Sequence, residues 1–131
     1  MTFLNVDLEI QSPTDPATLA AEIEGKAMVL YCGPFHDDHL VNIESRLRQA
    51  AADDKINDLC NIVESLSPSS RALWRDAIRR EFDAGFEAIP THEAVTLAIP
   101  SSTLRRMASL DVSFAITIYP PDASEALRDQ S

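Results

Sequence analysis

The sequence predicts an α+β protein, a two-layer sandwich in which one mixed, mostly antiparallel sheet is covered by helices on one face. Segments in which apolar and polar residues alternate are separated by segments with helical periodicity. Residues 1–33 and 94–119 each run strand, short helix, strand, so that two such units flank a central helical hairpin. The chain of 131 residues is long enough for one domain with a hydrophobic core. We expect this domain over residues 1–120, followed by a polar tail over residues 121–131.

The first part of the chain predicts a strand, a helix and a second strand. Apolar and polar residues alternate over residues 3–10, which is typical of a strand with one buried face. Asp15 is a favourable N-cap and Pro16 suits the first helical position, so we expect a short helix over residues 17–24. The continuous apolar run within residues 26–32 indicates a central strand that is covered on both faces.

The middle of the chain predicts two helices after a segment that fits two patterns. Residues 40–48 alternate like a strand but also carry apolar residues at helical spacing, and we prefer a strand that forms a hairpin with the preceding one. Amphipathic periodicity predicts helices over residues 53–66 and 69–82. The link between these helices is so short that they should pack against each other as a hairpin.

The last part of the chain predicts a short strand over residues 86–89, a strand over 94–99, a helix over 103–110 and a strand over 112–119. The last three elements repeat the order of the N-terminal unit, which is the basis of the predicted internal repeat. Two prolines follow the last strand and should end it.

The charge of the chain is strongly acidic and unevenly distributed. There are 11 Lys and Arg residues and 21 Asp and Glu residues, a formal net charge of −10 at pH 7. This charge argues against binding to nucleic acid or to an anionic membrane surface, because both require a surplus of basic residues. Residues 1–52 carry a net charge of −5, residues 53–82 of −1 and residues 83–131 of −4. The side of the molecule formed by the sheet should therefore be distinctly negative.

The sequence favours a cytoplasmic location. The N-terminus lacks a basic region followed by an apolar stretch, so we expect no signal peptide. No apolar run approaches the roughly 20 residues that a membrane-spanning helix needs. Cys32 and Cys60 both lie among apolar residues and are expected to be reduced thiols.

A polar tetrad after the second predicted strand is the main candidate for a binding or metal site: His36, Asp37, Asp38 and His39. These residue types are ligands that transition metals prefer, and Cys32 is close in sequence. His92 and Glu93 could add ligands from elsewhere in the fold. The two histidines of the tetrad converge on one ion only in a helix, and the alternative is a solvated turn between two strands. The paired motifs Cys-x-x-Cys and His-Glu-x-x-His do not accompany the tetrad.

Two charged features of the predicted helix over residues 69–82 fit more than one interpretation. Glu81 falls within the apolar arc, where a buried carboxylate would need a partner and would have a raised pKa, unless the helix frays there. A stripe of basic residues indicates either a solvated face paired with nearby acids or a patch that binds an anion or a partner. This stripe consists of Arg71, Arg75 and Arg79.

The C-terminal pattern resembles that of a family of small bacterial domains of unknown function. The resemblance lies in a strand that is followed by Ser-Ser-Thr-Leu-Arg-Arg-Met-Ala-Ser-Leu over residues 101–110 and by Ser-Phe-Ala-Ile-Thr-Ile-Tyr over residues 113–119. The opening strand around residues 8–10, with its short helix, is similar to the start of that family. These structural motifs cover about half of the chain and imply no chemistry. The tryptophan-rich middle of the family is missing, since Trp74 is the only tryptophan.

The acidic charge and the lack of a recognisable catalytic motif favour a non-enzymatic binding module for a basic protein partner, such as an immunity protein or an antitoxin. This interpretation predicts an exposed acidic cluster around an aromatic anchor. The alternative is a small metal-binding protein or enzyme centred on the tetrad over residues 36–39. A homodimer that completes its sheet across an edge strand is a third interpretation. No cofactor is expected.

Overall fold

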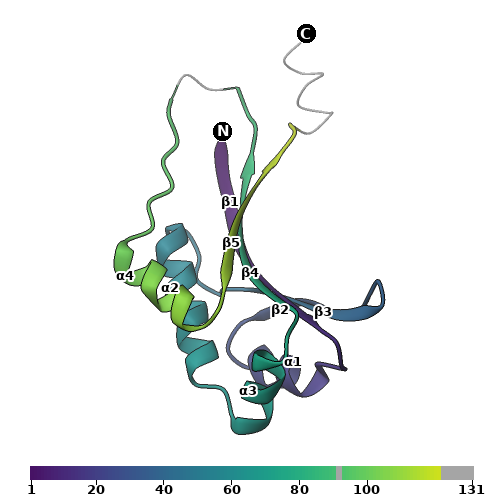
Figure 1. The fold of residues 1–131 in the computed structure, drawn as a ribbon. Coiled ribbons are helices and arrows are strands. Elements are labelled where there is room, and N and C mark those ends of the chain that lie inside the picture. Colours follow the sequence, from purple (N-terminus) through teal and green to yellow (C-terminus); the bar gives the residue numbers. More distant parts are fainter. Residues whose placement is uncertain (91–92, 122–131) are drawn as a thin grey trace.

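The computed structural model of the chain describes residues 1–90 and 93–121, and it has the predicted α+β architecture (Figure 1). The strands are β1 (Thr2–Ser12), β2 (Met28–Phe35), β3 (Asp38–Glu44), β4 (Arg79–Glu87) and β5 (Ser113–Tyr119). The helices are α1 (Ala17–Glu24), α2 (Ala52–Glu64), α3 (Pro68–Arg75) and α4 (Ser101–Ser109). The strands form one mixed sheet in the order β2-β3-β1-β4-β5, in which β4 and β5 are parallel and the other neighbours are antiparallel.

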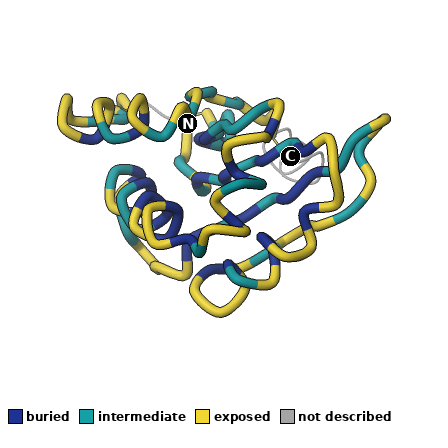
Figure 2. Tube along the Cα trace, turned by 60° about the horizontal axis from the view of Figure 1, so that its bottom comes forward, coloured by how far each residue is buried: buried dark blue, intermediate teal, exposed yellow. Residues whose placement is uncertain are grey.

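Strand β1 lies at the centre of this sheet, with β3 on one side and β4 on the other. Figure 2 shows buried and less buried residues alternating along the central strands, as the sequence predicts for β1. The buried side chains in the middle of β1 are Val6, Leu8 and Ile10. Leu4 is 48% exposed, because a register shift between Phe3 and Asn5 turns the alternation so that Phe3 packs against the core instead.

The helices bury their apolar sides against the same face of the sheet. Their core residues join those of β1 in one cluster, which includes Leu19, Ile23, Ile56, Leu59, Trp74 and Met107. Helix α3 lies beside α1, and α4 lies beside α2, so the chain forms two helix pairs where the sequence predicts one pair of consecutive helices. None of the helices in the described part of the chain is long and apolar enough to cross a membrane.

The segment after α3 differs most from the prediction. The helix expected over residues 69–82 ends at Arg75, and β4 begins at Arg79 and overlaps the short strand expected over residues 86–89. Apolar residues of this segment fit a helical arc as well as a strand. The segment forms a strand because it pairs with almost the whole length of β1, and such tertiary contacts outweigh local propensity. The side chains that β4 buries at alternate positions are Phe82, Ala84 and Phe86.

Strand β2 lies at the edge of the sheet, not at its centre as the apolar run over residues 26–32 predicts. It pairs with β3 alone within the described structure, and a register shift next to Tyr31 interrupts the pairing. Met28 and Tyr31 are 40% and 44% exposed, so the apolar run lines an edge of the sheet. The strand continues through Gly33 and Pro34. Proline cannot donate a ladder hydrogen bond, so it is found in edge strands such as β2 and not in central strands.

Two further segments, residues 40–48 and 94–99, can be compared with the secondary structure that the sequence predicts for them. Residues 38–44 form β3, so the strand preferred over residues 40–48 is confirmed for residues 40–44, whereas residues 45–48 belong to a loop. The strand expected over residues 94–99 is wrong, because this segment is a connection without regular structure from which Leu97 and Ile99 pack against the core. The C-terminal unit therefore lacks the first strand of the N-terminal unit, and the two units do not share the predicted order of elements.

Substitution of Ala84 tests the assignment of residues 79–87 to a central strand. Ala84 is fully buried opposite Val6, so Ala84→Asp places an unpaired charge in the core. We expect a loss of at least about 3 kcal/mol in the free energy of unfolding. Ala94→Asp, at an exposed position of the connection before α4, should change it by less than about 1 kcal/mol. Chemical denaturation measures both, and equal tolerance of the two substitutions would contradict the assignment.

Candidate functional site

The face of the sheet opposite the helices carries carboxylates at neighbouring positions of three strands. Asp7 of β1 is in register with Glu44 of β3 and with Asp83 of β4. Residues in register on adjacent strands point to the same face. The next residues along two of these strands, Leu8 and Phe82, are buried in the core, so the carboxylates lie on the open face. We call Glu44, Asp7 and Asp83 the acidic row.

A second row of carboxylates lies next to the acidic row and has a basic partner. Glu9 of β1 is in register with Glu81 of β4. Arg79 Nη1 lies 2.8 Å from Glu9 Oε2 and 3.3 Å from Glu81 Oε1. Within residues 1–90 and 93–121 no basic side chain forms an ion pair with the acidic row. The carboxylates of the acidic row therefore face one another without a counter-ion from the described protein.

The pKa of the Asp7 carboxyl group is raised from 3.8 to about 6. Burial is the largest cause, because a carboxylate that loses contact with water is less stable in its charged form. Repulsion by Glu44 comes next, and Asp83 adds to it, whereas a hydrogen bond with the Asn42 side chain lowers the pKa. Asp7 therefore titrates close to neutral pH, which is a common property of groups in functional sites.

Tyr119, at the end of β5, stands beside the acidic row. Its ring lies over Gly85, where an added Cβ atom would come within 3.3 Å of Tyr119 Cε2 and would push the ring aside. Thr117 Oγ1 lies 2.8 Å from Asp83 Oδ1 and holds this carboxylate in place. Tyr119 is 47% exposed and lines a pocket of about 170 Å³ together with the acidic row. The pocket thus combines carboxylates with an exposed aromatic side chain.

The predicted polar tetrad lies in the hairpin between β2 and β3. His36 and Asp37 form the two-residue turn, in which His36 has a φ of 55°. Asp38 Oδ2 accepts a hydrogen bond from Gln11 Nε2 at 2.9 Å. His39 is the next residue of β3, and so its side chain points to the face opposite that of Asp38. The structure therefore places the tetrad in a turn between two strands and directs its side chains apart.

The described residues, 1–90 and 93–121, contain no group of three or more His, Cys, Asp or Glu side chains that could hold a metal ion. Cys32 lies near the tetrad on β2, and partial burial together with Asp15 raises the pKa of its thiol, which favours the protonated form. His92 lies outside the described residues, and so does its predicted contribution to the tetrad, whereas Glu93 lies in the connection before α4.

Because β4 replaces the end of the helix expected over residues 69–82, the charged residues of this segment lie elsewhere than predicted. Glu81 lies on the open face beside Arg79 and not within an apolar arc. The predicted arginine stripe is divided, because Arg71 and Arg75 belong to α3 whereas Arg79 belongs to β4. The negative charge thus gathers on the sheet, where Arg79 is a partner of carboxylates.

No protein-family model matches the chain, and the searches of curated proteins and of solved structures gave no match either. The resemblance to small bacterial domains therefore stays a prediction, and the function has to be inferred from the site itself. Asp83 directly follows the helix predicted over residues 69–82, so its place in a strand is not expected from the sequence, and no sequence motif points to Tyr119. The sequence pattern that points to the acidic row is the alternation of Asp7 and Glu9 with apolar residues, which is typical of a strand with one face open to solvent.

Replacement of Asp7 tests its raised pKa. The unfolded chain loses this proton near pH 3.8 and the folded protein near pH 6. Protonation of Asp7 therefore stabilises the fold fully below about pH 4, and this contribution is lost as the pH rises through 6. Asp7→Asn avoids the cost of the buried charge and should raise the free energy of unfolding at pH 8 by about 1–2 kcal/mol.

Urea denaturation between pH 4 and pH 8 measures this difference, which should shrink toward the acidic end of the range. Glu24→Gln is the matched control, because it removes one carboxylate from an exposed position of α1. Its difference from the wild type should not follow the same pH profile. A constant difference between Asp7→Asn and the wild type across the range would contradict the raised pKa.

Proposed function

We propose that this protein is a cytoplasmic binding module that recognises a basic partner protein through the acidic row and Tyr119, as an immunity protein or antitoxin would. The observation that carries the proposal is the pocket in which three carboxylates without an ion-pair partner among the described residues meet an exposed aromatic ring. Aromatic side chains next to charged groups are typical centres of protein–protein interfaces.

The chemistry of this pocket suits an arginine side chain of the partner. A guanidinium group binds carboxylates through paired hydrogen bonds and stacks on aromatic rings with its planar face. An arginine beside Asp83 would contact the carboxylate and the Tyr119 ring at once. Lysine has no planar face and forms a single point charge, so arginine is the expected anchor.

Further carboxylates extend the negative surface around the acidic row. The register and alternation of β1, β3 and β4 place four more on the open face: Glu9, Asp38, Glu81 and Glu87. Arg79 is the only basic residue that the same register places on this face of the three strands. Such a surface accelerates the encounter with a basic protein, and the acceleration falls as the ionic strength rises.

The other two interpretations stay predictions. Metal binding by residues 36–39 has no support beyond the types of residue. A homodimer would use an edge such as β2, where Met28 and Tyr31 are exposed, and light scattering of the purified protein would detect it. The same measurement belongs at the start of every binding experiment, because self-association would change the number of accessible sites.

Substitution of the acidic row tests the proposal, with nona-arginine as the probe at low ionic strength. The test variant removes three charges from the open face: Asp7→Asn, Glu44→Gln and Asp83→Asn. The control variant removes three from exposed positions on the helical side: Glu24→Gln, Asp54→Asn and Asp76→Asn. Isothermal titration should show a loss of at least about tenfold in affinity for the test variant and of less than about threefold for the control. Equal losses would mean that binding follows net charge alone, which would refute the proposed site.

Tyr119→Ala tests the aromatic contact separately. The wild type should bind nona-arginine at least about fivefold more tightly than nona-lysine, because arginine stacks on the ring as well as pairing with carboxylates. Tyr119→Ala should bring this ratio close to one. Fluorescence anisotropy with labelled peptides measures the ratio, and Tyr31→Ala on the opposite edge strand is the control. A ratio that survives Tyr119→Ala would exclude Tyr119 from the recognition of arginine.

A further inference from the structure

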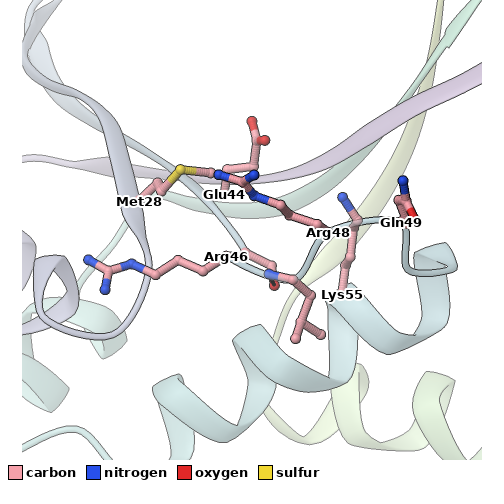
Figure 3. Close-up of a pocket in the computed structure, with 8 residues that line it drawn as sticks. Met28, Glu44, Arg46, Arg48, Gln49 and Lys55 are labelled. Atoms are coloured by element: carbon pink, nitrogen blue, oxygen red, sulfur yellow. Dashed lines mark hydrogen bonds between the residues drawn. The ribbon is translucent and has the colours of Figure 1, made fainter.

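A second pocket, of about 640 Å³, opens where β3 leaves the sheet (Figure 3). It is lined by Met28 of β2, by Glu44 at the end of β3, by the loop of residues 45–49 and by Lys55 of α2. Arg46, Arg48 and Lys55 make this lining basic, in a protein whose net charge is −10. Such a local excess of positive charge is a property that an anion would recognise.

Lys55 is the most unusual group of this lining, because its residue is only 7% exposed. Its Nζ donates a hydrogen bond to Asn5 Oδ1 at 2.9 Å, and this neutral oxygen is its one acceptor among the described residues. Among the described residues no carboxylate forms an ion pair with Lys55. An ammonium group has three N–H donors, and its burial without a counter-ion is costly. Lys55 therefore lies at the pocket with a single hydrogen bond and without an ion pair among the described residues.

Figure 3 shows how the basic side chains lie in this pocket. The Arg48 side chain extends toward Met28 and Glu44, whereas the Lys55 ammonium lies between Arg48 and the Gln49 amide in this view. Arg46 points away from them, and its Nη2 donates to the carbonyl oxygen of Glu24 at 2.7 Å. Arg48 is exposed and forms no ion pair within residues 1–90 and 93–121. Arg48 and Lys55 are therefore the two cations that a ligand could bring together.

We propose that this pocket binds a small organic anion, whose carboxylate or phosphate group is held by Lys55 and Arg48. The apolar part of the ligand would lie against Met28 and Leu47, two exposed apolar side chains of the same lining. Glu44 directs its carboxylate away from the Lys55 side chain. Glu44 lines both this pocket and the pocket of the acidic row, but the proposal rests on Lys55 and Arg48, so either site can fail without the other.

Thermal unfolding of the full chain with three probes tests this proposal. Benzoate represents a carboxylate with an apolar body, phenyl phosphate represents a phosphate with the same body, and inorganic phosphate represents the anion alone. Each is compared with NaCl at equal ionic strength, because phosphate also stabilises proteins by exclusion from their surface. At least one of the two aromatic anions should raise the Tm by about 3 °C or more beyond the NaCl reference, and by more than inorganic phosphate does.

Two variants link the effect to the pocket. Lys55→Met keeps the length of the side chain and removes the charge, so it should abolish the rise in Tm with ligand while raising the Tm of the ligand-free protein. Arg48→Gln, at an exposed position, should weaken the apparent affinity by about 5–20-fold. Arg105→Gln removes one positive charge from an exposed position of α4 and should keep the affinity of the wild type.

Two results would overturn the proposal. One is the absence of any rise in Tm beyond the NaCl reference with all three probes. The other is an equal rise in the wild type, Arg48→Gln and Lys55→Met, which would indicate an adventitious ion only. If Lys55→Met does not fold, the comparison of Arg48→Gln with Arg105→Gln tests the proposal, and equal affinities of these two variants would overturn it.

Discussion

The pairing of β1 on both of its sides is the constraint on which the rest of the structure depends. Because β3 and β4 occupy its two edges, the side chains of β1 can point only toward the helices or toward solvent. Val6 and Leu8 take the first direction and build the core, whereas Asp7 and Glu9 take the second. Asp7 cannot move away from the carboxylates on either side without loss of strand pairing. Its place in the middle of the sheet thus raises its pKa, first through burial and then through repulsion by Glu44 and Asp83.

Both candidate sites arise from the point at which β3 ends. Beyond the pair formed by Asp7 and Glu44, none of the described strands lies beside β1 on this side. There the Asn5 side chain accepts a hydrogen bond from Val6 N at 2.8 Å and another from Lys55 Nζ, so one amide joins the sheet edge to α2. The same strand end places Glu44 in the acidic row and opens the basic pocket next to it. Opposite charges therefore occur close together in a chain whose net charge suggests a uniform surface.

The fold could be predicted where an element depends on its own neighbours, as the helix over residues 17–24 and the alternation in β1 do. It could not be predicted where a distant partner decides, because the apolar residues around Phe82 fit a helix until β1 is placed beside them. The site follows the same rule. Asp7 and Asp83 meet only through the register of two strands that are far apart in sequence. The tetrad over residues 36–39 is contiguous and therefore conspicuous, but a hairpin directs consecutive side chains to opposite faces.

Thr2 and Glu87 are neighbours in the sheet, although most of the first two thirds of the chain lies between them. The free-energy cost of closing such a loop rises with its length, and sheets that are rich in distant pairs fold slowly. During synthesis β1 leaves the ribosome long before β4 exists, and in that interval only β3 can pair with it. The apolar face and one edge of the central strand stay open for this time, which is the state in which sheets aggregate. The chain is therefore most vulnerable to misassembly before residue 87 has been added.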